Sequence, residues 1–85
     1  MTKNKDITLT MIHNPSHLES QNSIGMGKTK AKQDDYGKGT WRKVLNIQGH
    51  GDAAFSGQGV AYESLTMSRL PKFSCGGSIH FITNN

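Results

Sequence analysis

The sequence predicts a small, mainly β protein, in which residues 1–85 form one domain built on an antiparallel sheet or sandwich of three or four strands. Three observations predict this class. Apolar and polar residues alternate in several short runs, ten glycines mark long loops between them, and no long run shows the apolar period of a core-packed helix. Because no crossover helix is evident, the strands are expected to pair in antiparallel fashion.

The first half of the chain supplies one predicted strand and one long loop. Residues 6–13 are the strand, because their apolar side chains fall on alternate positions. Pro15 ends it, and residues 16–21 suffice for a single helical turn that begins with a capping serine. Residues 22–40 are predicted to be a basic Gly/Lys loop, since they contain four glycines and little hydrophobic periodicity.

The second half supplies the remaining strands. Residues 41–48 alternate in the manner of a strand, and a glycine-rich loop follows at 49–59. Residues 60–70 are ambiguous: a strand is preferred, and the alternative is one short helix that Pro71 would end. After a Cys-Gly-Gly turn, residues 78–83 form the final predicted strand.

Composition limits both the core and the location. Only 33% of the residues are apolar, so the core is expected to be small and to be completed by a partner or a second copy of the chain. The single cysteine excludes an intrachain disulfide, and no apolar run is long enough for a signal peptide or a membrane span. These features predict a protein of the cytoplasm, or of a virion assembled in a cytoplasm, with no membrane partner.

Positive charge is concentrated in the first half. The formal net charge is +4, and all of it comes from residues 1–43, which hold eight Lys or Arg and four Asp or Glu. Such a segment attracts phosphate or an acidic protein surface, and aromatic rings among the cations could stack on unpaired bases. The candidate nucleic-acid-binding residues are the cations and rings of this segment: Lys28, Lys30, Lys32, Tyr36, Lys38, Trp41, Arg42 and Lys43.

Three motifs that could carry chemistry are each incomplete. Residues 25–30 end like a phosphate-binding loop, but Asn22 stands where the motif needs glycine and no buried strand precedes it. The histidines at positions 13, 17, 50 and 80 could join Cys75 at a zinc ion, but a close cysteine pair is absent. Cys75 also lacks the surroundings of a nucleophile, and a small packed residue at a turn is the simpler interpretation. The sequence therefore predicts no enzyme activity, no cofactor and no metal.

Two functions fit these features. The first is a small non-enzymatic binding protein that engages nucleic acid or a nucleoprotein complex through the basic loop, with an affinity that falls steeply with salt. The alternative is a structural or interaction subunit of a larger assembly, such as a minor virion or decoration protein, or a small inhibitor that docks on a larger complex. A thin core favours this alternative, because loops that order on neighbouring subunits would complete it.

Overall fold

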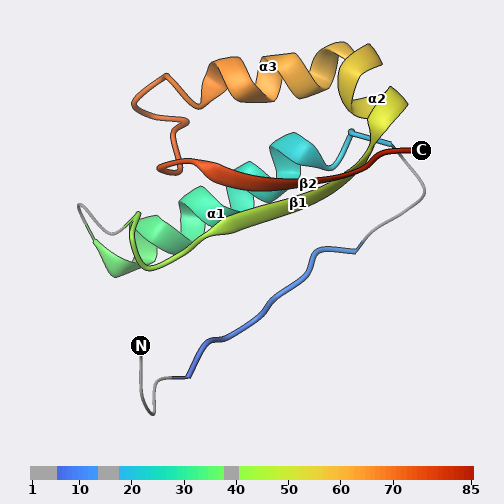
Figure 1. The fold of residues 1–85 in the computed structure, drawn as a ribbon. Helices are drawn as coiled ribbons and strands as arrows, with labels where there is room; N and C mark the ends of the chain where they lie inside the picture. The colour runs from blue at the N-terminus through green and yellow to red at the C-terminus, as the bar shows by residue number, and fades with distance from the viewer. Residues whose placement is uncertain (1–5, 14–17, 38–40) are drawn as a thin grey trace.

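The computed structural model describes residues 6–13, 18–37 and 41–85. Along these residues the chain forms α1 (Asn22–Tyr36), β1 (Asn46–Gly51), α2 (Asp52–Gly57), α3 (Gly59–Met67) and β2 (Ser78–Thr83), as Figure 1 shows. The two strands pair in parallel, and α2 and α3 form the connection between them. The described part is therefore a β–α–β unit with a preceding helix, and the predicted mainly β, antiparallel class is wrong.

The helical side of the sheet is lined by polar residues. α1 contacts both β1 and α3, and α2 contacts both strands. The register places Asn46 opposite Ser78 and His50 opposite Ile82. Because side chains alternate along a strand, the even-numbered positions of both strands face the same way. Asn46 and His50 are buried at such positions, and a hydrogen bond from Gln48 to the carbonyl of Asn22 joins this face to α1.

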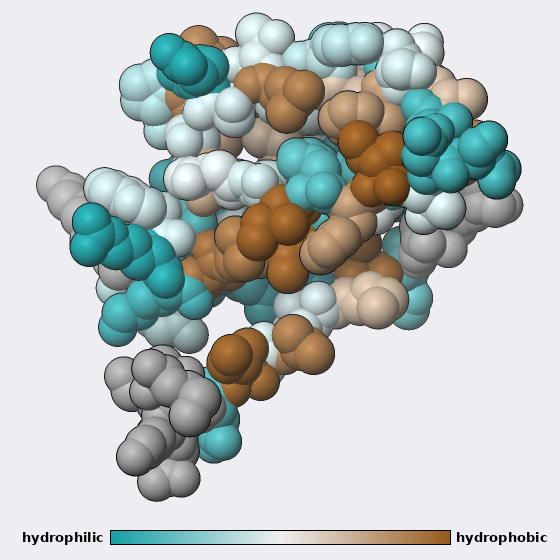
Figure 2. All heavy atoms as spheres, in the orientation of Figure 1, coloured by the Kyte–Doolittle hydropathy of each residue, from teal (hydrophilic) through white to brown (hydrophobic). Residues whose placement is uncertain are grey.

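The opposite face of the sheet is apolar and uncovered. Ile47, Ile79 and Phe81 occupy odd-numbered positions and are 54%, 44% and 63% exposed. Figure 2 shows apolar residues gathered on the surface over the two strands. Parallel strands are normally covered on both faces. The buried apolar residues in the described part are few and mostly small, so the expected small core is confirmed: Met26, Ala54, Ala61 and Cys75.

The predicted loop at 22–40 is instead largely the helix α1. This helix buries four residues at spacings of three or four, which marks one helix face: Asn22, Met26, Thr29 and Gln33. Three of the four are polar, so the buried stripe carries no apolar period that a sequence pattern could detect. The helix also tolerates two glycines in its first half, which the sequence interpretation took as signs of a loop.

The remaining elements divide into confirmed and corrected ones. The strand predicted at 78–83 is confirmed as β2 with the same bounds. At 60–70 the preferred strand is wrong, and the helix alternative is confirmed by α3. The strand predicted at 41–48 is confirmed only in its last part, since residues 41–43 form a turn. The loop predicted at 49–59 contains the end of β1 and all of α2.

The first predicted strand, at 6–13, does not join the sheet. In the described part of the chain these residues have no strand partner, and Figure 1 shows them running apart from the helices. Ile7, Leu9 and Met11 are 81%, 87% and 88% exposed, so the apolar face that alternation predicts is not buried here. The helical turn expected at 16–21 lies partly outside the described residues.

Candidate functional site

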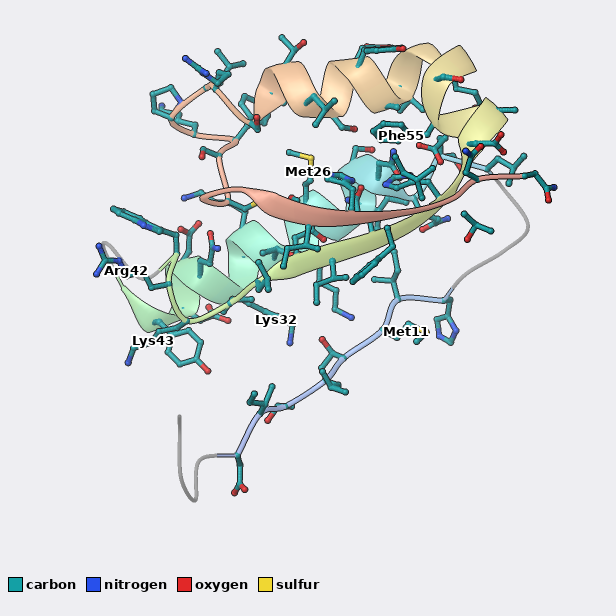
Figure 3. All side chains as sticks on the ribbon, in the orientation of Figure 1. Met11, Met26, Lys32, Arg42, Lys43 and Phe55 are labelled. Carbon is teal, nitrogen blue, oxygen red and sulfur yellow. The ribbon has the colours of Figure 1, made fainter. Side chains whose placement is uncertain are left out.

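Three ionisable side chains come together between the sheet and the helices: Glu19, His50 and His80. Glu19 belongs to the turn before α1, and the histidines lie on β1 and β2. Both histidines occupy even-numbered positions of paired strands, so both side chains leave the same face of the sheet. Figure 3 shows nitrogen-bearing side chains gathered close to the labelled Phe55 of α2. Glu19 and His50 are 31 residues apart in sequence, so only the fold brings them into contact.

The three side chains form a continuous chain of hydrogen bonds. Both carboxylate oxygens of Glu19 lie 2.9 Å from Nδ1 of His50, and Nε2 of His50 lies 2.7 Å from Nδ1 of His80. The imidazole planes differ by 25° and their centres are 5.0 Å apart, so the rings meet edge to edge along the N···N line. The centre of the Phe55 ring lies 4.6 Å from that of His50 and 5.9 Å from that of His80. An apolar ring therefore lies against both imidazoles.

The three side chains differ in burial. Glu19 and His50 are each only 6% exposed, whereas His80 is half-buried. An ionised carboxylate only accepts hydrogen bonds, so beside an ionised Glu19 the hydrogen-bond donor is Nδ1–H of His50. The side chain of Asn22 donates a further hydrogen bond of 2.9 Å to Glu19, which helps to compensate a buried negative charge. This arrangement can exchange a proton with its surroundings at the His80 end.

The cluster lies near the edge at which both parallel strands end. Asp52 begins α2 directly after β1, and Asn84 and Asn85 follow β2. In open α/β sheets, ligands bind outside the carboxyl ends of the strands. The carboxylate and amide groups at this edge therefore lie where a ligand is expected. Within residues 6–13, 18–37 and 41–85, no three or more His, Cys, Asp or Glu side chains are placed to hold a metal ion.

Comparison with known proteins identifies the family. The family model described as "Dehydrogenase E1 component" matches residues 1–85. This chain belongs to the dehydrogenase E1 family. The Glu19–His50–His80 cluster, and the edge at which β1 and β2 end, are therefore parts of an E1 chain.

Relatives of this E1 chain match it over nearly its whole length. The 2-oxoglutarate dehydrogenase E1 component of Rickettsia felis is 54% identical over 82 residues, which cover 96% of this chain and 8% of that protein. The Rattus norvegicus protein named "2-oxoglutarate dehydrogenase-like, mitochondrial" is 49% identical, with the same coverage of 96% and 8%. A probable 2-oxoadipate dehydrogenase complex component E1 homolog of Caenorhabditis elegans is 42% identical over 90 residues, covering 94% and 10%. The chain thus spans about a tenth or less of the length of these relatives.

These findings correct the predicted function. E1 components of 2-oxoglutarate dehydrogenase are enzymes, so the prediction of a non-enzymatic protein is wrong. Nucleic acid, a nucleoprotein complex and an acidic protein surface are wrong as predicted partners, and the virion, decoration and inhibitor alternatives are wrong as well, because the family is one of dehydrogenase components. A cationic segment attracts anions in general, so its charge does not identify which anion binds.

The predicted location in a virion receives no support, because the relatives are mitochondrial by name or bacterial by source. The prediction of a location inside a cell agrees with these relatives. In the part of the E1 chain that the structure describes, no helix is both long enough and apolar enough to cross a membrane.

Some of the residues predicted to bind nucleic acid do share one surface. Lys28, Lys32 and Tyr36 are four residues apart along α1 and therefore lie on one stripe of the helix. Nζ of Lys43 lies 5.5 Å from the centre of the Tyr36 ring, and Figure 3 shows Lys32 and Lys43 toward one end of α1. Nucleic acid is no longer the expected ligand of this basic stripe. A role of the stripe in binding another anion stays a prediction.

The other predicted residues lie apart from that stripe. Lys30 forms an ion pair of 3.1 Å with Asp34 one helical turn later. Trp41 packs against the backbone of Gly76, and Arg42 is exposed in the turn before β1. Lys38 lies outside the described residues. Charge and aromatic content therefore predict a surface that is separate from the Glu19–His50–His80 cluster, and its role in binding stays a prediction.

The residue that sequence reasoning missed is Glu19. His50 and His80 entered the zinc hypothesis, but their facing nitrogens bond to each other. Glu19 was assigned only to a helical turn, and nothing in its local sequence indicates burial.

The prediction of Cys75 as a packed residue at a turn is confirmed, because it is 2% exposed and its Sγ lies 3.6 Å from the carbonyl oxygen of Gly77.

Burial, followed by the neighbouring His50, lowers the pKa of His80 below its usual 6.5, although Glu19 acts in the opposite direction. The folded state therefore binds a proton at His80 less readily than the unfolded state. Stability is complete above pH 6.5 and is lost as the pH falls through the lower, folded-state pKa. We expect the unfolding temperature to fall as the pH is lowered from 7.5 to 5. The His80→Asn variant should show a smaller fall, and His13→Asn, on an exposed histidine, should leave it unchanged.

Proposed function

We propose that this chain acts as part of the E1 component of a dehydrogenase whose substrate is a 2-oxo dicarboxylic acid, with 2-oxoglutarate as the first candidate. The observation that carries the proposal is the 54% identity to a 2-oxoglutarate dehydrogenase E1 component across 96% of the chain. The rat relative carries the same substrate name, and a third relative is named for 2-oxoadipate, a longer acid of the same class.

The geometry supports a contribution of this chain to the site of such an acid. Asp52, Asn84 and Asn85 follow the carboxyl ends of two paired parallel strands, which is the edge where α/β sheets bind ligands. The asparagine amides carry N–H donors that suit carboxylate oxygens. The nearby cluster of Glu19, His50 and His80 adds groups that can donate or accept a proton.

Proposals on the partner and the location follow from the same relatives. An E1 component works together with other subunits of a dehydrogenase complex, so we propose such subunits as the protein partners. The interior of a bacterium or of a mitochondrion is the proposed location, in agreement with the source and name of the relatives.

A substrate comparison tests the proposal. The E1 component that carries this segment is purified, and the reduction of an artificial electron acceptor is followed with 2-oxoglutarate, 2-oxoadipate and pyruvate. We expect kcat/KM for a dicarboxylic acid to exceed that for pyruvate by at least about 100-fold, because a site that bonds the second carboxylate disfavours an acid without it. The Asn84→Ala variant removes one of these amide donors and should lose at least about 10-fold in kcat/KM, whereas Glu63→Ala, on an exposed residue of α3, should not. Equal use of pyruvate, or no reduction with any acid, would contradict the proposal.

A further inference from the structure

The edge of β1 that faces away from β2 has no strand beside it in the described part of the chain. The sheet there consists of β1 and β2, so β1 pairs on one side. An edge of this kind presents a row of backbone N–H and C=O groups to which a further strand can add. A two-stranded sheet is at best marginally stable in water, and three or more strands are normally needed. The free edge of β1 is therefore a place where the sheet can gain a strand.

Residues 6–13 have the length and the side-chain pattern of such a strand. The segment is two residues longer than β1, which has six, so it can span the whole free edge. Ile7, Leu9 and Met11 alternate with Thr8 and Thr10, and the three apolar side chains are 81%, 87% and 88% exposed. A row of large apolar side chains exposed together marks a surface that contacts another part of a protein.

The segment also runs in the direction that parallel pairing needs. Figure 1 shows residues 6–13 running the same way as β1 and β2, whereas α1 runs the opposite way. Parallel neighbours must be joined by a crossover of a dozen or more residues, usually a helix. α1 has 15 residues and lies between the segment and β1 in sequence. The order of segment, α1 and β1 is thus the order of a β–α–β unit, like the unit formed by β1, the two following helices and β2.

The handedness of the connections selects the edge. Crossovers between parallel strands are right-handed in nearly all proteins. α1 contacts β1 and α3, and α2 contacts both strands, so both crossovers lie on one face of the sheet. Two right-handed crossovers over the same face advance across the sheet in the same direction. The strand before α1 therefore belongs on the side of β1 away from β2, which is the free edge.

The side chains of the segment match the two faces of the sheet. Asn46 and Gln48 lie on the polar face toward the helices, whereas Ile47 lies on the uncovered apolar face. When Leu9 lies on the same face as Ile47, the apolar row of the segment extends the apolar face of the sheet. The threonines then extend the polar face, because successive side chains point to opposite faces.

We propose that residues 6–13 act as a strap, which lies open in this structure and closes on the free edge of β1 as a third parallel strand in the complete E1 component. Closure supplies strand partners to the backbone groups of that edge and moves apolar side chains out of water. The strap carries the turn before α1 with it at its carboxyl end, so it joins the sheet on the side of α1. The proposal concerns the assembly of the sheet and does not depend on the substrate of the enzyme.

Disulfide trapping in the complete E1 component tests the closure. Leu9→Cys is combined with Ile47→Cys in one variant and with Gly49→Cys in another, because neighbours on one face of adjacent strands are about 5 Å apart and within disulfide reach. Thr10→Cys with Ile47→Cys is the matched control, since these side chains would leave opposite faces. We expect one Leu9 pair to cross-link at least about 10-fold faster than the control pair under mild oxidation. Rates equal to the control in both pairs would contradict the closed strap.

Hydrogen exchange gives a second readout that needs no new cysteine. Leu9→Asp places a charge on the apolar face of the strap, so it should raise amide exchange in both residues 6–13 and β1 by at least about 10-fold. Leu70→Asp makes the same change at another exposed leucine, after α3, and should leave exchange in β1 unchanged. If the strap stays open, Leu9→Asp will not alter β1 either, and that result would overturn the proposal. Neither measurement uses a substrate, so a failure of the proposed function is seen separately.

Discussion

Replacing Gln33 with leucine is expected to lower the free energy of unfolding by about 3 kcal/mol. The side chain is only 3% exposed, and its Nε2 donates to the carbonyls of Cys75 at 2.8 Å and Val44 at 2.9 Å, with a longer contact of 3.4 Å to that of Trp41. Leucine fills a similar volume but offers no donor, so buried carbonyls would lose their partner, at a cost of about 1–3 kcal/mol for each unsatisfied group.

Hydrogen exchange of the α1 amides in the E1 component measures this effect locally. Gln33 connects α1 to the segments that lead into β1 and β2, so its loss should raise exchange in all three places. Gln58→Leu, on a half-buried glutamine before α3, serves as the control and should change stability by less than about 0.5 kcal/mol. A change of less than about 1 kcal/mol in Gln33→Leu would show that the three contacts do not determine how α1 docks.

Gly76→Ala is expected to destabilise the protein by about 2–3 kcal/mol. The φ of Gly76 is +77°, where an alanine costs about 1–2 kcal/mol. A Cβ there would also lie 2.8 Å from Cβ of Trp41 and 3.1 Å from two atoms of its indole ring. Cβ is attached directly to the backbone and cannot rotate away, so the turn before β2 would have to move.

Gly27→Ala is the matched comparison, with the opposite sign. Gly27 lies exposed within α1, and an added Cβ would meet nothing within 4 Å. Alanine favours the helix over glycine by about 0.5–1 kcal/mol, so this variant should gain stability. Thermal unfolding measures both effects: the unfolding temperature should fall in Gly76→Ala and rise in Gly27→Ala. An unchanged unfolding temperature in Gly76→Ala would show that Trp41 does not pack closely against this turn.

The part of the fold that the sequence predicts is the part in which apolar residues carry the pattern. β2 was predicted with its bounds because its apolar side chains and the preceding glycines are local signals. The helix alternative at 60–70, which Pro71 was expected to end, matches α3 in type, although α3 already ends at Met67. α1 was missed because its buried stripe is mostly polar, as Thr29 and Gln33 illustrate, and a polar stripe looks the same in sequence as a solvated surface.

The candidate site was predicted only in fragments for a related reason. His50 and His80 were noticed as histidines, but no spacing rule links two residues that lie 30 positions apart in the sequence. Their contact depends on parallel pairing with Gln48 opposite His80, and that pairing follows from two helices in a stretch predicted as loop and strand. Glu19 enters the site through a turn with positive φ, which no local pattern predicts for glutamate.

The sequence by itself determined the amount of apolar surface, the net charge, the position of the last strand and the shortage of large core residues, because these depend on composition and on neighbours in the chain. Only the tertiary structure decided that the strands run in parallel, that α1 docks through amide hydrogen bonds, and that Glu19, His50 and His80 come within hydrogen-bond distance of one another. These features arise from contacts between residues about 30 or more apart. Such contacts depend on the free energy of the whole arrangement rather than on any one segment.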